Sequence, residues 1–190
     1  DKTGKQTSNK YLPDGWTELC KRYGHSYAAV GGNRDNYPQT VTSKYPIKVE
    51  QRITNSNVSG KPISHGAGHF TITVDGKKVN IVTLHMWPQA YGYGVSSSKQ
   101  EESAAKFEGD YYRAFEMQYI VDQTIKNTKY KSEELWLFGG DTNARSRLDN
   151  WYYKYDENST KLITHDILLN QTNMKDVIAH RYPGTFMSST

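Results

Sequence analysis

Six side chains of the sequence have types and positions that suit phosphate chemistry. Each lies near the end of a strand-like run, and the six residues are Arg34, Tyr37, His85, Asp141, Asn143 and Arg145. Hydrolysis of a phosphoester requires charge neutralisation on the phosphoryl oxygens, an oriented water molecule and a leaving oxygen that is protonated or bound by a metal. Together the six side chains can meet these requirements, so they favour phosphoryl chemistry.

Each of these residue types contributes something different. Asp141 and Asn143 offer a carboxylate and an amide oxygen, a hard ligand pair for Mg²⁺ or Mn²⁺; Mg²⁺ keeps most of its own waters. His85 can donate a hydrogen bond to a phosphate oxygen and adds charge as imidazolium. Arg34 or Arg145 can clamp a phosphate in a forked geometry that lysine does not match. Taken singly, each also has a plain structural explanation, such as a turn former or a buried histidine.

Two strand-like segments are expected to position the histidine and the carboxylate. An alternating apolar run before the Asp75-Gly76 turn predicts a β-hairpin, whose second arm, residues 79–84, leads to His85. Residues 135–138 are apolar on both faces, which is typical of a central strand. The Gly139-Gly140 pair that follows allows close backbone approach, and strand alternation predicts that Asn143 projects on the same side as Asp141.

The remaining pattern indicates helices mixed with hairpins. A long helix is expected from apolar residues at helical spacing with Gln118 as the polar interruption, namely Ala104, Phe107, Tyr111, Ala114, Val121 and Ile125. Its other face carries Lys106, Asp110, Arg113 and Glu116, so it should cover one face of a sheet. A short helix at 13–22, strands at 39–43 and 47–53, a loop at 149–155 and a short element at 173–180 complete the prediction. No repeat or linker divides the chain, so we expect one domain over residues 1–190 with an α/β sandwich fold.

Composition narrows the class of protein only slightly. The net charge of +4 fits ordinary solubility and also an anionic substrate, and it argues mildly against a tight duplex-binding nuclease. No stretch approaches the roughly 18 apolar residues of a membrane span. Cys20 is the only cysteine, so no intrachain disulfide can form. We infer no stable protein partner and expect a monomer; an exported and a cytoplasmic bacterial protein fit the composition equally well.

The order of these segments resembles the endonuclease/exonuclease/phosphatase superfamily. Residues 40–47 resemble its strand reading roughly Ser-Lys/Arg-Tyr/Phe-Pro-Ile, residues 79–85 its Asn-Thr-His-Leu strand, residues 140–143 its Gly-Asp-Phe-Asn motif, and residues 175–186 its Asp…Pro-x-Thr-Phe segment. The resemblance extends over about residues 12–190. It implies a deoxyribonuclease-like, four-layer α-β-β-α sandwich of mixed, largely antiparallel sheets.

The resemblance also implies a role for each residue. Asp141 would orient or deprotonate the attacking water, Asn143 would hold the phosphate or a metal-bound water, and His85 would contact the scissile phosphate. The Arg34…Tyr37 pair resembles an arginine and a tyrosine that some nuclease members place beside the scissile bond. Arg145 stands where members often place a substrate contact.

Two family features are missing from the sequence. An early strand ending in a metal-binding Glu and a closing Ser-Asp-His motif are not found, and His165-Asp166 is reversed and too early, so we interpret it as a helix or turn feature. We therefore expect a portion of a longer domain, incomplete at both ends. The 190-residue chain alone is expected to be nearly inactive.

The sequence thus predicts a divalent-metal-dependent hydrolase of phosphoester bonds. Nucleic acid, inositol phosphate and phospholipid headgroups all stay open as substrates, as does the choice between phosphodiesterase and phosphatase. The alternatives are a non-catalytic binding module that retains the scaffold, and a plain structural domain. Aromatic stretches at 87–93 and 151–155 either stack on such a substrate or pack within loops.

Overall fold

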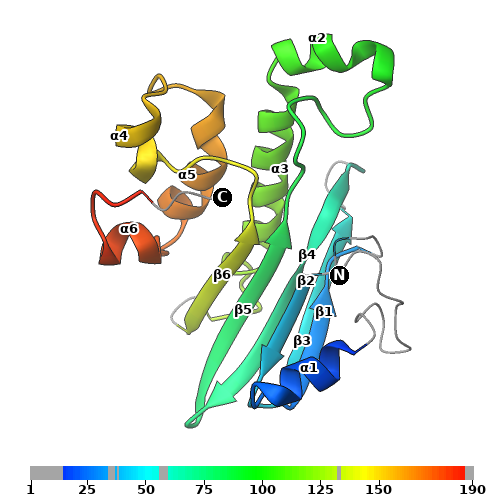
Figure 1. Cartoon of the computed structure of the whole chain (residues 1–190), viewed down its shortest axis with the longest axis vertical. Coiled ribbons are helices and arrows are strands. Elements are labelled where there is room, and N and C mark those ends of the chain that lie inside the picture. Colours follow the sequence, from blue (N-terminus) through cyan, green and yellow to red (C-terminus); the bar gives the residue numbers. More distant parts are fainter. Residues whose placement is uncertain (1–14, 34–36, 38, 56–59, 132–133, 187–190) are drawn as a thin grey trace. The chain divides into compact units, whose positions relative to one another are not determined.

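The chain forms two compact units in a computed structural model (Figure 1). The structure describes residues 15–33, 37, 39–55, 60–131 and 134–186. The sheet unit comprises the described parts of Asp1–Met86 and Gln123–Thr142, and the helical unit those of Trp87–Asp122 and Asn143–Thr190. The prediction of a single domain over the whole chain stays a prediction.

The sheet unit contains one short helix and two sheets. Its elements are α1 (Trp16–Arg22), β1 (Tyr27–Gly31), β2 (Gln39–Ser43), β3 (Lys48–Asn55), β4 (Pro62–Val74), β5 (Lys77–His85) and β6 (Leu135–Asp141). The larger sheet has the order β3-β4-β5-β6, in which β5 and β6 are parallel and the other neighbours antiparallel, and β1 and β2 form an antiparallel pair. The predicted class, α/β with mixed, largely antiparallel sheets, is confirmed.

The hairpin signal at Asp75-Gly76 is confirmed as the β4–β5 turn. Both residues have positive φ, 50° and 75°, which a tight hairpin turn of this hand requires. The pairing continues from Val74↔Lys77 to Ala67↔Leu84 without a shift, so the turn fixes the register all the way to the end of β5. That register decides which side chain stands at the strand end, and it is His85.

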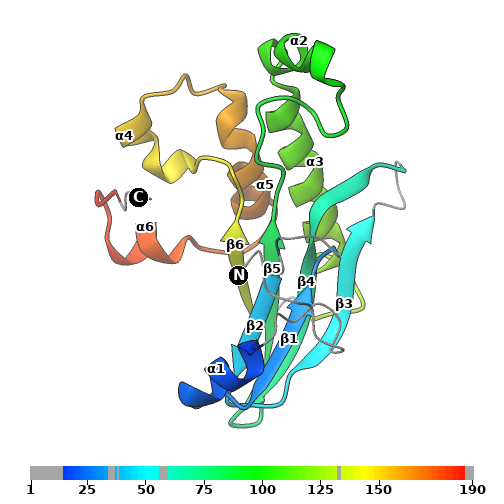
Figure 2. The ribbon, with the colours of Figure 1, turned by 45° about the vertical axis from the view of Figure 1, so that its right-hand side comes forward.

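The two sheets of this unit approach each other closely. A Cβ at Gly31 in β1 would overlap the Cα of Gly68 in β4, so only glycine backbones allow the contact. The fully buried ring of Phe70 lies beside the same two glycines. Figure 2 shows β1 and β2 lying over the larger sheet, and this packing sets the position of the segment that follows β1.

The prediction that β6 is a central strand, buried on both faces, is wrong. Among the described strands, β6 pairs only with β5 and stands at the edge of its sheet. Trp136 is buried against His69, with ring centroids 5.0 Å apart, whereas Leu135 and Leu137 are about half exposed, at 60% and 47%. An apolar run does not reveal which of its faces is covered, because alternation sends successive side chains to opposite faces.

The helical unit contains short helices and most of one long one. Its elements are η1 (Ser97–Lys99), α2 (Gln100–Ala105), α3 (Glu108–Gln123), η2 (Arg147–Asp149), α4 (Asn150–Tyr153), η3 (Thr160–Leu162), α5 (Ile163–Gln171) and α6 (Val177–Arg181). The single long helix that we predicted is interrupted, because Phe107 has a φ of 57° and separates α2 from α3. The predicted loop at 149–155 contains α4. None of the described helices is long and apolar enough to cross a membrane.

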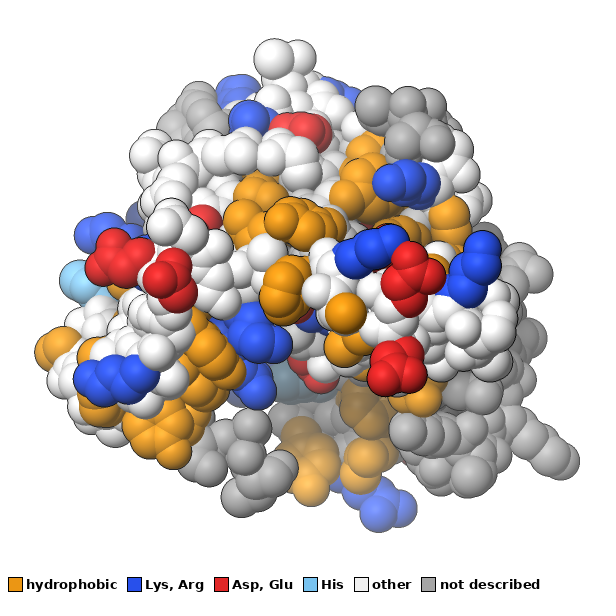
Figure 3. Space-filling model, turned by 90° about the horizontal axis from the view of Figure 1, so that it is seen from above, with side chains coloured by type: hydrophobic (Ala, Val, Ile, Leu, Met, Phe, Trp, Pro, Cys, Tyr) orange, Lys and Arg blue, Asp and Glu red, His pale blue; other side chains and the backbone are white. Residues whose placement is uncertain are grey.

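The buried face of α3 differs from the predicted one. Asp110, Arg113 and Glu116, which we placed on the solvent side, are at most 6% exposed, whereas Phe107 and Tyr111 are more than half exposed. These charged side chains can be buried because each has a polar partner. Arg113 forms an ion pair with Asp110, and Glu116 accepts a hydrogen bond of 2.9 Å from the backbone N–H of Trp87. Elsewhere, basic and acidic side chains are interspersed on the face shown in Figure 3, in keeping with the small net charge.

Candidate active site

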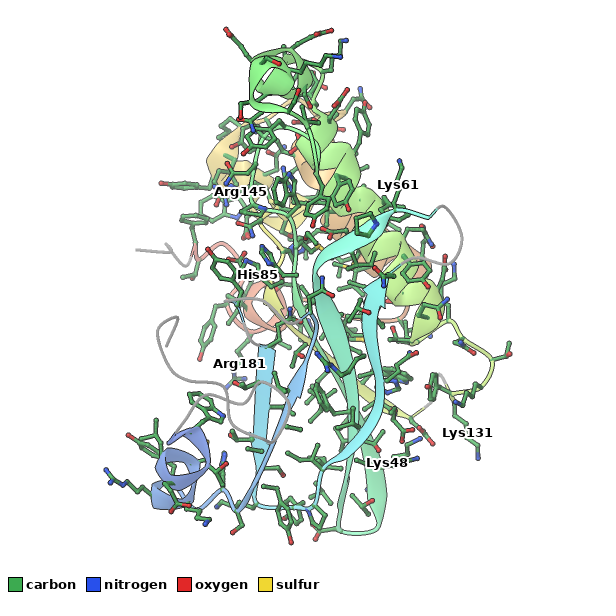
Figure 4. The ribbon with its side chains drawn as sticks, turned by 90° about the vertical axis from the view of Figure 1, so that its right-hand side faces the viewer. Lys48, Lys61, His85, Lys131, Arg145 and Arg181 are labelled. Atoms are coloured by element: carbon green, nitrogen blue, oxygen red, sulfur yellow. The ribbon has the colours of Figure 1, made fainter. Side chains whose placement is uncertain are left out.

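The ends of β5 and β6 bring two of the predicted residues together. In the parallel pairing of these strands His85 is the register partner of Asp141, so the two side chains leave the sheet on the same side. The backbone N–H of Met86 then donates to the carbonyl of Asp141 over 2.9 Å. Figure 4 shows His85 at this end of the sheet, opposite the end that carries Lys48. His85 is half-buried and Asp141 is exposed.

Gly140 makes this close pairing possible. Its φ is 138°, and a Cβ at this position would overlap the carbonyl oxygen of Leu84 on the neighbouring strand. Gly139 has no such neighbour within 4 Å. The predicted role of the glycine pair, close backbone approach beside the carboxylate, is therefore carried by Gly140 alone.

Three aromatic rings pack together at this end of the sheet. The imidazoles of His65 and His85 stack with centroids 4.4 Å apart and an interplanar angle of 28°. Tyr37 packs edge-on against His85 at 5.3 Å and lies 4.6 Å from His65. Tyr37 thus stands next to His85, and its predicted substrate contact stays a prediction, while Arg34 lies outside the described residues.

His65 reaches this cluster because the backbone of β4 breaks its alternation. Gly68 and Phe70 face the smaller sheet, and simple alternation would send His65 to the opposite face. Gly66 has a φ of 80°, and such a local irregularity re-aims a neighbouring side chain. A Cβ at Gly66 would lie 2.6 Å from the carbonyl oxygen of Ile53, so no other residue fits there without displacing the backbone.

The segment that carries Tyr37 is anchored to the same stretch of β4. The backbone N–H of Asn33 donates to the carbonyl of His65 over 2.8 Å, and its side-chain amide donates to the carbonyl of Ile63 over 2.7 Å. Gln39, on the other side of Tyr37, also donates to the His65 carbonyl, over 2.7 Å. These bonds fix both ends of the segment to β4, next to the ring cluster.

Asn143 and Arg145 belong to the helical unit, in the stretch that follows β6. The alternation argument for Asn143 is wrong, because β6 ends at Asp141 and Asn143 has a left-handed φ of 48°. Asparagine tolerates this conformation better than most residues. The guanidinium of Arg145 lies over the ring of Tyr153 at 5.0 Å.

The donor set fits a loosely held, water-rich cation better than a closed metal centre. Among the described residues no group of three His, Cys, Asp or Glu side chains is placed to hold a metal ion. Mg²⁺ is commonly bound through one or two carboxylates together with waters, and the exposed carboxylate of Asp141 fits that mode of binding. A tetrahedral zinc site would need more ligands than these.

Two further histidines have structural roles. His69 is fully buried, its Nε2 lies 3.0 Å from the Oδ1 of Asn80, and burial lowers the pKa of its ring despite that hydrogen bond. His165 lies within α5, where burial also lowers its pKa, and its neighbour Asp166 pairs with Arg147 over 2.7 Å. The interpretation of His165-Asp166 as a helix feature is confirmed.

His65 is the residue that sequence reasoning missed. It occurs inside a strand, not at a strand end, so its place in the chain gave no reason to single it out. The one available signal was the glycine that follows it, since glycine inside a strand marks an irregularity or a close backbone approach.

Comparisons with known proteins give a structural likeness only. No family model and no curated protein matches the sequence. Sphingomyelinase C from Streptomyces griseocarneus is similar with a TM-score of 0.49 and 20% identity, covering 80% of this chain and 52% of that one. Beta toxin from Staphylococcus aureus is similar with a TM-score of 0.49 and 16% identity, covering 89% of this chain and 58% of that one. A mutant of beta toxin with bound magnesium ions has a TM-score of 0.46 and 16% identity, covering 89% of this chain and 57% of that one. The chain spans little more than half the length of these proteins.

Proposed function

We propose that this chain carries the phosphate-binding part of a divalent-metal-dependent phosphoester hydrolase. The observation that carries the proposal is the register pairing of His85 with Asp141 at two neighbouring strand ends. An imidazole and a carboxylate held side by side at the ends of two neighbouring strands are suited to contact a phosphoryl group and a water molecule at the same time. A purely structural pair would not require an exposed carboxylate at this position.

The neighbouring residues give each group a defined task. His85, whose ring is stacked on His65 and bordered by Tyr37, donates a hydrogen bond to a phosphoryl oxygen from a fixed ring position. Asp141 orients the attacking water and accepts its proton. Asn143 and Arg145, shortly after it in the chain, bind phosphate oxygens, the second as a forked donor.

A bound Mg²⁺ or Mn²⁺ would supply charge neutralisation on the phosphoryl oxygens when held by Asp141 and Asn143. The substrate classes that this chemistry allows are those with an accessible phosphoester: nucleic acid, an inositol phosphate or a phospholipid headgroup. A binding module that keeps the same residues without turnover is the second candidate, and the experiment below separates the two.

The test compares variants for metal binding and for hydrolysis. Water-proton relaxation measures Mn²⁺ binding, and release of nitrophenol from bis(p-nitrophenyl) phosphate measures hydrolysis at high protein concentration. Asp141→Asn should weaken Mn²⁺ binding and abolish the metal-dependent rate. His85→Gln should leave Mn²⁺ binding intact and lower that rate about a hundredfold, the usual effect of removing one donor to a transition-state oxyanion.

Matched controls come from the same chain. Asp75→Asn changes a carboxylate in the β4–β5 turn, where asparagine suits the left-handed backbone, and His180→Gln changes an exposed histidine of α6. Neither should alter either readout. Mn²⁺ binding that survives Asp141→Asn, or a metal-dependent rate that survives His85→Gln, contradicts the assigned roles. Metal and phosphate binding without any turnover favours the binding module.

A further inference from the structure

The helical unit contains a cavity of about 300 Å³. Its lining comes from α2 and α3, from the segment before η1, from the residues before η2 and after α4, and from η3. A volume of this size holds a small organic ligand or a part of a larger one. All of its lining residues belong to the helical unit, so the cavity is defined within that unit alone.

The charge of the cavity wall is positive and only partly balanced. Three cationic side chains and one carboxylate line it, namely Arg113, Arg145, Lys161 and Asp110. The carboxylate is paired with Arg113, whereas neither Arg145 nor Lys161 has a carboxylate partner in the described part of the chain. Two positive charges therefore remain on the wall, and a site of this kind attracts an anion.

The two unbalanced cations are held in place by aromatic rings and by the backbone. The guanidinium of Arg145 lies 5.0 Å from the ring centroid of Tyr153, and the ammonium of Lys161 lies 5.9 Å from that of Tyr155. The backbone N–H of Arg145 donates to the carbonyl of Lys161 over 3.1 Å, which ties the two segments together. Stacking on a ring leaves the outward N–H donors of a cation available to a ligand.

Arg113 makes its part of the lining rigid. It is 6% exposed, its Nη1 donates to the carbonyls of Trp87 and Gln89 over 2.9 Å each, and its Nη2 binds Asp110. Thr160 donates to the second oxygen of Asp110 over 2.6 Å. The wall is therefore built before any ligand arrives, which lowers the entropy lost on binding.

The lining also contains apolar residues. Pro88, Ala90, Ala104 and Phe107 are among them. Phe107 is 52% exposed and its backbone is left-handed, with a φ of 57°. A bulky, half-exposed residue held in this conformation is an unfavourable arrangement that recurs at ligand sites.

From the cationic and the apolar lining residues together we propose that this cavity binds a phosphomonoester, with the phosphate on Arg145 and Lys161 and the organic part against Phe107. The inference deepens the proposed function and rests on it in part, since Asn143 and Arg145 belong to both. Beyond the proposed function, it assigns a ligand-binding role to Lys161 and Phe107 and names the class of ligand. Binding at this cavity needs neither a metal nor hydrolysis, so it can be tested without them.

The experiment is a calorimetric titration of the whole chain in buffer with EDTA at low salt. The probes are inorganic phosphate and three phosphomonoesters: adenosine monophosphate, inositol 1-phosphate and phosphocholine. Each phosphomonoester that fits should bind more tightly than inorganic phosphate. The one that binds most tightly identifies whether the organic group is a nucleoside, an inositol or a choline headgroup. Lys161→Gln and Arg145→Gln should each weaken binding about tenfold, the usual effect of losing one charge-assisted hydrogen bond.

The matched control is Lys99→Gln, which removes an exposed lysine of η1 in the same unit and should leave every affinity unchanged. Phe107→Ala should weaken the phosphomonoesters without affecting inorganic phosphate. No saturable binding, or affinities equal in Lys161→Gln and the control, overturns the inference. Inorganic phosphate binding as tightly as all three esters overturns the assignment of the organic group. If the chain binds phosphomonoesters in EDTA but shows no metal-dependent hydrolysis, the result counts against the proposed function alone. If it hydrolyses the phosphodiester but binds no phosphomonoester in EDTA, the result counts against this inference alone.

Discussion

Replacing Gly66 with alanine should destabilise the sheet unit well beyond the cost of an ordinary glycine substitution. Gly66 has a φ of 80°, and its added Cβ would meet the Ile53 carbonyl oxygen at 2.6 Å, the Gly32 Cα at 2.8 Å and the Asn33 N at 3.0 Å. All three are backbone atoms, so no side-chain rotation can relieve the contact. Two of these atoms, those of Gly32 and Asn33, belong to the segment that is hydrogen-bonded to the His65 carbonyl.

The magnitude follows from two contributions. A left-handed backbone costs an L-residue about 1–2 kcal/mol. Displacing packed backbone by several tenths of an ångström costs about 1–3 kcal/mol more, as overpacking does elsewhere. The expected loss is therefore about 2–5 kcal/mol, a large part of the stability of a typical domain. Gly76→Ala separates the contributions, because Gly76 has a φ of 75° and nothing within 4 Å of the added Cβ.

Urea unfolding followed by far-UV circular dichroism measures the loss, and hydrogen exchange of β4 and β5 amides assigns it to the sheet unit. Gly66→Ala should exceed Gly76→Ala by about 1–3 kcal/mol, which is the contact contribution alone. It should also disturb the ring proton shifts of His65 and His85, which Gly76→Ala leaves unchanged. Equal losses in the two variants would refute the argument that backbone contact, and not conformation, fixes Gly66.

Three further outcomes are expected. Burial lowers the pKa of His69 below its ordinary value of about 6.5, so the unfolded chain binds the proton more readily. The contribution of His69 to stability should be full above that pH and fall as the pH drops below it. Urea midpoints at several pH values measure the fall, and His69→Gln should reduce it but leave the part that comes from His165, whose pKa burial also lowers. Gly140→Ala should lower the melting temperature and the metal-dependent rate, whereas Gly139→Ala, with open space around it, should change both much less. Arg113→Gln leaves a buried carboxylate unpaired and should cost about 3–5 kcal/mol in urea unfolding, whereas Lys106→Gln, in an exposed ion pair, should leave the midpoint unchanged.

The sequence revealed those parts of the site whose position depends on local signals. A hairpin turn at Asp75-Gly76 and an apolar arm of known length were sufficient to predict a strand ending at His85. The motif around Asp141 likewise marked the end of a strand. That the two would become register partners was not predicted, since nothing local specifies which strands pair.

The parts that could not be predicted depend on contacts between distant segments. The buried face of α3 was misassigned because Arg113 and Glu116 are charged, and their burial depends on partners in the 87–89 segment. His65 was missed because its direction depends on the conformation of Gly66, which in turn depends on the approach of β3 and the segment after β1. A one-dimensional pattern contains neither piece of information.

The geometry of the candidate site therefore depends on backbone approach more than on side-chain packing. Gly31 and Gly68 let the two sheets meet, Gly66 turns His65 onto His85, and Gly140 lets β6 bring Asp141 beside the end of β5. At each of these positions a single added methyl group meets backbone that cannot rotate away. A catalytic group must be held to within a fraction of an ångström to be useful. Backbone contacts of this kind provide that precision while leaving the exposed carboxylate accessible to water and substrate.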